Sequence, residues 1–490
     1  MKVVLAGFNV DTEGMKTGDG RILTPETLSA AYARISRSPR SIDALRKQAR
    51  KEIEQARRSN RTIIFEMGHH SIAEHAVFNF DIIGISRRAV EELEHFRLNS
   101  YTEKSQRYVT LQGDFVIPDE IVGTKLTDDY KGTIERQNDL YQELFGNIRA
   151  YYLKKNKKAE EGTKLRKQLE NLAKEDGRYI LSQATQTQLG ATINARNLEL
   201  MIRRFASHPL AEVRELGSKL YELVKDVAPS ILLFCAANPY DEKTYPALRK
   251  HAQRLGMPQR QRHKQEGVEL IDYTRNADDK ILCALLFHIS GRTYQDCRRQ
   301  VKRMSRKERL TLFRRSLKHM ELFDTVLREF ECAQLTYALT VSAACFGQLK
   351  RHRLATLITQ DYQPSLGIVI PPIVKKVGME RMFRDVIEHT ETVYQKIEKK
   401  GFGIGGYVLT NAHQKRVLMS MNLRELYHIS RLREDPTAQW DIRQKAQQMS
   451  TLARKVMPIT TLLLGGKTDY PAVYRRLYGK KPRITSVPEP

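Results

Sequence analysis

The segment that decides the fold runs from Gly68 to Val109 and reads GHHSIAEHAVFNFDIIGISRRAVEELEHFRLNSYTEKSQRYV. Within it Phe78, Phe80 and Ile82 alternate with polar residues, and this period of two predicts a strand with one buried face. Ala89, Leu93 and Phe96 follow at the spacing of one helix face. The segment therefore predicts a strand, then a helix, then a polar loop.

The same order of residues occurs twice in the chain, which indicates a duplicated unit. An upstream set recurs 256 positions later and a downstream set 228 positions later. The difference of 28 residues predicts an insertion in the first copy, an exposed helical excursion in the Lys- and Glu-rich segment from Leu153 to Glu175. The matched residues are Ser86, Leu93, Arg97 and Leu98 with Ser342, Leu349, Arg353 and Leu354, and Gly177, Tyr179, Leu181, Asn194, Arg196, Leu198 and Arg203 with Gly405, Tyr407, Leu409, Asn422, Arg424, Leu426 and Arg431.

We expect an α+β fold in tandem duplication, with a sheet and long packed helices in each copy. The expected first copy spans residues 1–245, a basic linker spans 246–266, and the second copy spans 267–490. Helical patterns run from Asn194 to Val227 and from Asn422 to Met457. Each is interrupted at a proline, Pro209 or Pro436, where a helix breaks or begins.

Composition indicates a chain that folds without disulfides or a zinc site. The chain has 490 residues, 41% of them hydrophobic, and five scattered cysteines with no C-x-x-C pair. Neither a signal peptide nor an apolar stretch of membrane-spanning length is found, so we expect a cytoplasmic protein with no membrane partner.

The net charge of +26, from 83 Lys and Arg against 57 Asp and Glu, calls for an anionic substrate or partner. Basic residues gather at Lys154 to Lys174, at Arg249 to Lys264 and at Arg475 to Arg483. Aromatic residues do not alternate with these cations, so nucleic acid is a possible partner but not the favoured one.

The motifs of the first copy resemble those of flavin-dependent thymidylate synthases. His69, Ser71, Glu74 and His75 precede the strand, and Ser100, Glu103, Ser105 and Arg107 occupy the loop, all at the family's spacing. The Arg-His-Arg that ends the family's helix is His95-Phe96-Arg97 here. The second copy shows the reverse, since it keeps Gln348 and Arg351-His352-Arg353 but has Thr356, Thr359, Asp361 and Gln363 in the loop.

The division continues downstream. The arginine that the resemblance assigns to the nucleotide is Arg178 in the first copy and Gly406 in the second. The arginine that the family uses to activate the uracil ring is Arg433 in the second copy and Phe205 in the first. Whether Arg203 or Arg204 replaces it in the first copy stays open.

The resemblance implies an enzyme that methylates dUMP to dTMP with FAD, methylenetetrahydrofolate and NADPH, at composite sites built by both copies. It also implies a homodimer that mimics the family's tetramer. The implied catalytic residue is Arg433. The implied flavin-binding residues are Ser71, Arg351, His352, Arg353, Asn422, Arg424 and His428, and the implied nucleotide-binding residues are Glu103, Lys104, Ser105, Gln106, Arg107, Arg178, Gln348 and Arg351.

Two other motifs suggest alternatives to this interpretation. His70, Glu74 and His75 miss the H-x-x-E-H metal pattern by one residue, so no metal is expected. The glycines from Gly401 to Gly406 lack the flanking strand and helix of a dinucleotide fingerprint, so we expect a turn. Two rival functions stay open: a flavin- and folate-dependent enzyme acting on another uracil-containing substrate, including nucleic acid, and a degenerate homologue that binds RNA.

Overall fold

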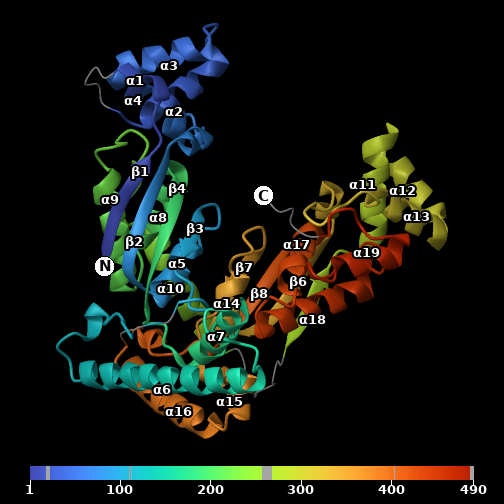
Figure 1. The fold of residues 1–490 in the computed structure, drawn as a ribbon. Coiled ribbons are helices and arrows are strands. Elements are labelled where there is room, and N and C mark those ends of the chain that lie inside the picture. The colour runs from blue at the N-terminus through green and yellow to red at the C-terminus, as the bar shows by residue number, and fades with distance from the viewer. Residues whose placement is uncertain (18–22, 110, 112, 257–266, 402, 486–490) are drawn as a thin grey trace. The chain divides into compact units, whose positions relative to one another are not determined.

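A computed structural model describes residues 1–17, 23–109, 111, 113–256, 267–401 and 403–485 (Figure 1). The chain forms two compact units. Unit 1 comprises residues 1–261 and 371–410, and unit 2 comprises residues 262–370 and 411–490. Of the expected linker at 246–266, residues 246–254 lie in a helix, and residues 257–266 lie outside the described part of the chain.

Unit 1 contains a four-stranded antiparallel sheet in the order β1-β2-β4-β3. Its strands are β1 (Lys2–Phe8), β2 (Val77–Ser86), β3 (Ser100–Glu103) and β4 (Gln186–Asn194). Its helices are α1 (Thr12–Thr17), α2 (Glu26–Arg34), α3 (Ile42–Lys51), α4 (Ile53–Arg61), α5 (Arg87–Glu94), α6 (Leu126–Lys155), α7 (Lys164–Gly177), α8 (Ala195–Ala206), α9 (Ala211–Val224), α10 (Pro239–Arg254), α15 (Pro372–Lys376) and α16 (Glu380–Glu398), with shorter turns η1 (Ile35–Arg37), η2 (Thr62–Glu66), η3 (His70–His75), η4 (Asp119–Ile121), η5 (Arg178–Ile180) and η8 (Gly405–Tyr407).

Unit 2 repeats the arrangement with the strand order β5-β6-β8-β7, again all antiparallel. Its strands are β5 (Val268–Tyr273), β6 (Gln334–Ser342), β7 (Thr356–Thr359) and β8 (Gln414–Asn422). Its helices are α11 (Ala277–Ser290), α12 (Tyr294–Arg303), α13 (Arg306–Ser316), α14 (Ala343–Leu349), α17 (Leu423–Arg433), α18 (Trp440–Val456) and α19 (Tyr470–Tyr478), with the turns η6 (Arg328–Cys332) and η7 (Pro364–Leu366).

The expected mixture of helix and sheet and the expected duplication are both confirmed. Equivalent hydrogen bonds occur in the two copies. In the first copy Ser86 Oγ caps α5 by accepting from Ala89 N, and the same hydroxyl donates to Glu212 Oε2 (2.6 Å). In the second copy Ser342 Oγ accepts from Cys345 N and donates to Asp441 Oδ2 (2.6 Å). An N-cap residue held by a buried carboxylate therefore starts the equivalent helix in both copies.

The alternation in the quoted segment correctly predicts β2, because Phe78, Phe80 and Ile82 are buried and Asn79 and Asp81 are exposed. The helix is shorter than its periodicity indicates. α5 ends at Glu94, so Phe96 lies beyond the helix. Its counterpart α14 ends at Leu349, and Arg351-His352-Arg353 likewise follows the helix instead of ending it.

The compact units do not follow the copy boundaries. Residues 371–410, which belong to the second copy by sequence, pack in unit 1. α16 lies along α6, where Gln137 Nε2 donates to Thr390 Oγ1 (2.8 Å) and to Val408 O (2.9 Å). Tyr407 OH donates to the buried Glu212 (2.8 Å). The apolar faces of α6 and α16 thus pack against each other. The copy boundaries expected at residues 245 and 267 refer to the sequence repeat and stay a prediction.

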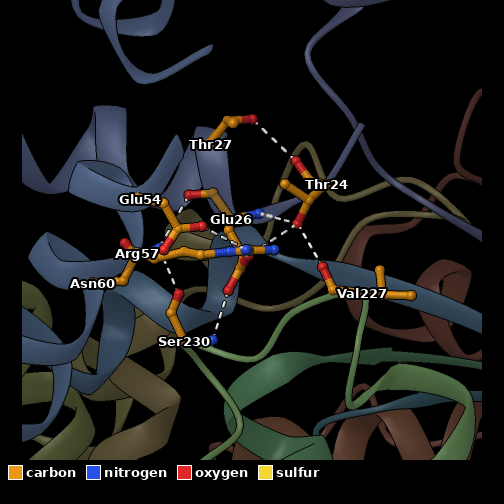
Figure 2. A network of polar contacts seen from close by, with 8 residues as sticks. All are labelled: Thr24, Glu26, Thr27, Glu54, Arg57, Asn60, Val227 and Ser230. Carbon is orange, nitrogen blue, oxygen red and sulfur yellow. Dashed lines mark hydrogen bonds and ion pairs between the residues drawn. The ribbon is translucent and has the colours of Figure 1, made fainter. Parts of the chain in front are cut away.

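The buried carboxylate of Glu26 connects helices α2 and α4 of unit 1 to the segment that follows α9 (Figure 2). Glu26 accepts from Arg57 Nε (2.8 Å) and from the backbone of Ser230 (2.6 Å), and Thr24 Oγ1 donates to Val227 O (2.6 Å). Arg57 also pairs with Glu54 (2.9 Å). The ion pair and the backbone donors compensate the cost of burying Glu26.

Within the described ranges, no helix combines the length and the apolar character needed to cross a bilayer.

Candidate functional site

The predicted nucleotide loop of the first copy carries a cluster of arginines with two acidic partners. Arg107 forms an ion pair with Glu175 at the end of α7, and Arg87 at the start of α5 forms one with Glu103. Arg178 follows α7 directly, is buried, and donates from Nε to Glu175 O (3.3 Å). The structure therefore brings the sequence-predicted Arg107 and Arg178 to one place, against the same glutamate.

The guanidinium groups of this cluster repel one another. Burial lowers the pKa of Arg178; Tyr179 and Glu175 oppose this shift, and the nearby guanidinium groups of Arg107 and Arg87 add to it. Arg87 lies near the carboxylates of Glu94 and Glu91 as well as that of Glu103, yet Arg178 still experiences the repulsion of the two other guanidinium groups. An anion with several oxygen acceptors would relieve this repulsion, and the forked donors of arginine match phosphate oxygens.

Two other predicted loop residues, Ser105 and Lys104, form hydrogen bonds that hold the backbone next to this cluster. Ser105 Oγ accepts from Arg107 N (3.2 Å), and Lys104 N donates to Gln188 O of β4 (2.9 Å). Gln106 is buried, and the Lys104 side chain is exposed. Ser105 thus fixes the turn that directs Arg107, by the local side-chain-to-backbone bonding typical of serine.

The second copy lacks this cluster as a set. At the two repeat offsets, Arg87, Arg107 and Arg178 correspond to Ala343, Gln363 and Gly406, and the acidic partners Glu103 and Glu175 correspond to Thr359 and Gly403. Five charged residues are therefore exchanged together for neutral ones.

A different polar chain occupies the second copy. Arg433, at the end of α17, donates from Nε to His352 Nε2 (2.9 Å) and from a terminal nitrogen to Gln348 O (3.3 Å). His352 is 2% exposed, and its Nδ1 faces Glu425 Oε1 at 3.5 Å. We call Arg433, His352 and Glu425 the second-copy triad.

The triad fixes the protonation of its histidine. Arginine can only donate, so His352 Nε2 accepts and the ring proton resides on Nδ1, toward Glu425. Burial lowers the pKa of His352 well below 6.5, and the charge of Arg433 lowers it further. Burial also raises the pKa of Glu425. A neutral imidazole therefore holds the guanidinium group of Arg433 in place.

The first copy has an apolar version of the triad. Phe96, Phe205 and Asn197 occupy the positions of His352, Arg433 and Glu425. The two phenylalanine rings meet edge to face with centroids 5.6 Å apart. The histidine–arginine pair has thus become a hydrophobic contact.

Neither neighbouring arginine restores that charge to the interior of the first copy. Arg203 Nε contacts Asp241 Oδ2 (2.9 Å) and Arg204 Nε lies 3.8 Å from Asp241 Oδ1. Both arginines are thus drawn toward one carboxylate on α10, and Arg204 also lies over the Phe96 ring (5.9 Å).

Gln348 adjoins the triad and is 8% exposed. Both its amide atoms, Oε1 and Nε2, are buried with no hydrogen-bond partner among the described residues. A buried amide without partners is costly, so Gln348 is a candidate for contact with a water molecule or a ligand.

The predicted flavin residues lie in several local settings. Arg351 is half-buried and Arg353 exposed, both directly after α14. His428 is exposed and meets the His352 ring edge to face with centroids 5.6 Å apart. Ser71 is exposed on η3 of unit 1.

Two predicted flavin residues serve the local fold. Asn422 Oδ1 caps α17 by accepting from Glu425 N (2.9 Å). Arg424 pairs with Glu331 (3.0 Å) and donates to Val326 O (3.0 Å), as Arg196 of the first copy pairs with Glu74 (2.5 Å).

Sequence reasoning missed Arg87, Glu175 and Glu425. Arg87 and Glu175 carried a usable signal, because each is charged in the first copy and neutral at the matched position of the second, the same pattern that singled out Arg107 and Arg178. Glu425 carried little signal, since an acidic residue in the first turn of a helix is ordinary.

A family model described as thymidylate synthase complementing protein matches residues 21–230 and 269–459. The chain belongs to the flavin-dependent thymidylate synthase family. The two matched regions confirm both the resemblance and the duplication, so this is a tandem enzyme of the flavin-dependent thymidylate synthase type, and the family name implies a flavin cofactor.

Two relatives show how this chain compares in length. A UPF0159 protein of Thermoplasma acidophilum is 26% identical over 447 residues, covering 81% of this chain and 86% of its own length. A flavin-dependent thymidylate synthase of Clostridium tetani is 31% identical over 215 residues, covering 43% of this chain and 82% of its own length. The first relative matches most of the tandem, and the second matches about one copy.

Among solved structures, the crystal structure of the UMP/dUMP methylase PolB from Streptomyces cacaoi, bound with 5-Br dUMP, is similar to part of this chain. It is 20% identical with a TM-score of 0.32, and the similarity covers 40% of this chain and 92% of that one.

Proposed function

We propose that this chain methylates dUMP to dTMP, with methylenetetrahydrofolate as one-carbon donor, FAD as cofactor and NADPH as its reductant. Each working site would draw residues from both copies. The complementary loss supports this most directly. The first copy alone keeps the arginine cluster around Arg107 and Arg178, and the second copy alone keeps the triad and Gln348.

The first copy would bind the nucleotide phosphate. Arg107 pairs with the Glu175 carboxylate and Arg178 donates to the backbone carbonyl of the same residue, so a phosphate placed there could form charge-assisted bonds to both guanidinium groups. Removing one such contact should weaken nucleotide binding by roughly 1.5 to 3 kcal/mol, about 10- to 150-fold.

The second copy would bind the uracil ring. The unpartnered amide of Gln348 offers one donor and one acceptor, which match the alternating carbonyl and N–H groups on the edge of uracil. Arg433 would stand at a uracil carbonyl, where its charge stabilises the electron-rich ring that attacks the one-carbon unit. His352 and Glu425 would position Arg433 without touching the substrate.

The residues of the second copy fit a flavin dinucleotide. Arg351, Arg353 and the exposed His428 are donors suited to a diphosphate, and Asn422 keeps its Nδ2 donor because only Oδ1 caps the helix. Arg424 would act by holding the start of α17, since its guanidinium group is already engaged. When bound at these residues, reduced FAD would supply the hydride that completes the methyl group, and the uracil C5 proton would be released.

Two chains would form a homodimer that carries four copies, the number found in the family's tetramer. Light scattering of the purified chain should therefore give twice the mass of 56.7 kDa. A strict monomer with full activity would place each working site within one chain.

A mixing experiment tests the composite site. Arg107→Ala and Arg433→Ala, each in a separate chain, should both abolish dTMP formation. Asp361→Ala and Gly406→Ala, at the degenerate positions, are the matched controls and should retain it. Gly406 has room for a methyl group, since a Cβ there would lie 3.6 Å from its nearest neighbour, Arg88.

The outcomes separate the possible arrangements. Activity recovered on mixing the two inactive chains would show sites built between chains, and no recovery would favour sites within one chain. Normal turnover by either arginine variant alone would overturn the assignment of that residue.

A further inference from the structure

The most basic stretch among the described residues lies outside every motif of the proposed site. Residues 292–318, which cover α12 and α13 of unit 2, contain eleven lysines and arginines and only two acidic residues. The basic residues are Arg292, Arg298, Arg299, Lys302, Arg303, Arg306, Lys307, Arg309, Arg314, Arg315 and Lys318, and the acidic ones are Asp296 and Glu308.

These cations face outward. α12 is anchored by the buried Cys297 and Val301, and α13 by the buried Phe313. Arg298, Lys302, Arg303, Arg306, Lys307, Arg314, Arg315 and Lys318 are exposed and form no ion pair with any residue that the structure describes. We call this set the α12–α13 surface.

The equivalent part of the first copy pairs three of its arginines with acidic residues. α3 and α4 stand between β1 and β2 as α12 and α13 stand between β5 and β6. There Arg46 and Arg50 pair with Asp11 and Glu13, and Arg57 pairs with Glu26 and Glu54 (Figure 2). Lys47, Lys51, Arg58 and Arg61 are also exposed there with no ion pair to a described residue, so the first copy carries four such cations where the α12–α13 surface carries eight.

Neighbouring elements extend the charged area. α11, α12 and α13 lie side by side with α19 beside them (Figure 1), and Tyr478 OH of α19 donates to Arg314 O (2.9 Å). Arg475 and Arg476 on α19 are exposed, and so are Lys480 and Lys481, which follow this helix. On another side, a depression of about 970 Å³ is lined by both basic and acidic residues, namely Arg275, Arg306, Arg309, Lys455, Asp278 and Asp279.

We propose that the α12–α13 surface binds the phosphate backbone of nucleic acid. Most of its cations are arginines, whose planar forks suit phosphate oxygens and whose faces stack on bases. α12 is about 15 Å long, enough to follow roughly four phosphates of one strand. Phe287 and Tyr294, 53% and 42% exposed, adjoin the cations and offer rings for base stacking.

Fluorescence anisotropy with the full chain tests this, using fluorescein-labelled 20-nucleotide single-stranded RNA, duplex RNA and duplex DNA at 50 to 200 mM KCl. The test variant is Lys302→Glu/Arg303→Glu/Arg306→Glu/Lys307→Glu. Its control is Lys157→Glu/Lys158→Glu/Lys164→Glu/Lys167→Glu in the first copy, which alters the net charge equally. The exposed control lysines also have no described ion pair.

We expect the test variant to lose at least tenfold in affinity at 100 mM KCl, with a log–log salt slope smaller by about 3, and the control to lose less than threefold. The milder Arg298→Gln/Arg306→Gln gives the same comparison if the fourfold variant does not fold. dUMP turnover should be unchanged in every variant, which separates this proposal from the proposed catalytic function.

Three results would overturn the proposal. The first is that the unaltered chain binds none of the nucleic acids at 50 mM KCl. The second is that the test and control variants lose the same amount of affinity for nucleic acid. The third is that the unaltered chain binds phosphatidylserine-containing vesicles more tightly than all three nucleic acids.

Discussion

Replacing His352 by phenylalanine tests whether the second-copy triad positions Arg433. The substitution installs the residue that the first copy carries as Phe96, so the shape is tolerated in this fold. It removes the acceptor at 2.9 Å from Arg433 Nε, whereas the longer contact from Arg433 to Gln348 O (3.3 Å) remains. A hydrogen bond from a charged donor contributes about 1.5 to 3 kcal/mol, so kcat/KM for dUMP should fall about 10- to 150-fold.

The assay is dTMP formation under anaerobic conditions, with flavin absorbance and thermal unfolding as measures of occupancy and fold. His352→Gln should restore part of the activity, because its amide oxygen can accept from Arg433. Phe96→His in the first copy is the control and should change nothing, since Phe205 stands where an arginine would be needed. Full kcat/KM in His352→Phe would refute the positioning role.

The same variant has a signature in the pH dependence of stability. The pKa of His352 is lowered in the folded chain, so below pH 6.5 the unfolded chain binds a proton that the folded chain does not. The free energy of unfolding therefore decreases as the pH is lowered below 6.5, by about 1.4 kcal/mol per pH unit for that proton. His352→Phe should lack this component, and urea unfolding at pH 7 and 5.5 measures the difference.

Three further predictions concern the nucleotide, the flavin and the turn after Arg433. Arg107→Ala should raise the Kd for dUMP about 10- to 150-fold by calorimetry, whereas Asp361→Ala should leave it within threefold. Arg351→Ala/Arg353→Ala should remove the yellow flavin absorbance, and full occupancy in that variant would place the cofactor elsewhere. Burial alone would raise the pKa of Asp435, but hydrogen bonds from Thr437 and Thr468 outweigh it and lower the pKa to about 2. The stability that these bonds give is present above the unfolded pKa of 3.8 and is lost as the pH falls toward 2. Asp435→Asn should therefore destabilise the chain by about 1 to 3 kcal/mol at pH 7. Urea unfolding should show that the difference in stability between this variant and the unaltered chain becomes smaller below pH 4.

Local patterns predicted the elements that local physics determines. The alternation at Phe78 to Ile82 predicted β2 because a half-buried strand imposes that period, and the breaks at Pro209 and Pro436 fall between α8 and α9 and between α17 and α18. The repeat offsets correctly align β4 with β8, since both strands end at an asparagine that caps the next helix.

The remaining features depend on contacts between distant residues. The periodicity at Phe96 continues that of α5, yet the helix ends at Glu94, and Phe96 packs on Phe205 from another helix. The burial of Glu425 beside His352 follows from the packing of α17 against the end of α14, which no local pattern encodes. The association of residues 371–410 with unit 1 was likewise hidden, because α16 has an amphipathic pattern that any apolar partner would satisfy.

Product analysis tests the proposed reaction most directly. The purified chain would be incubated anaerobically with FAD, NADPH, methylenetetrahydrofolate and either dUMP or a uracil-containing RNA, and the products identified by mass spectrometry. We expect dUMP to be converted to dTMP, with conversion abolished in both Arg107→Ala and Arg433→Ala. Unchanged dUMP beside methylated RNA would show the rival uracil substrate, and unchanged dUMP and RNA with flavin bound would contradict the proposed reaction.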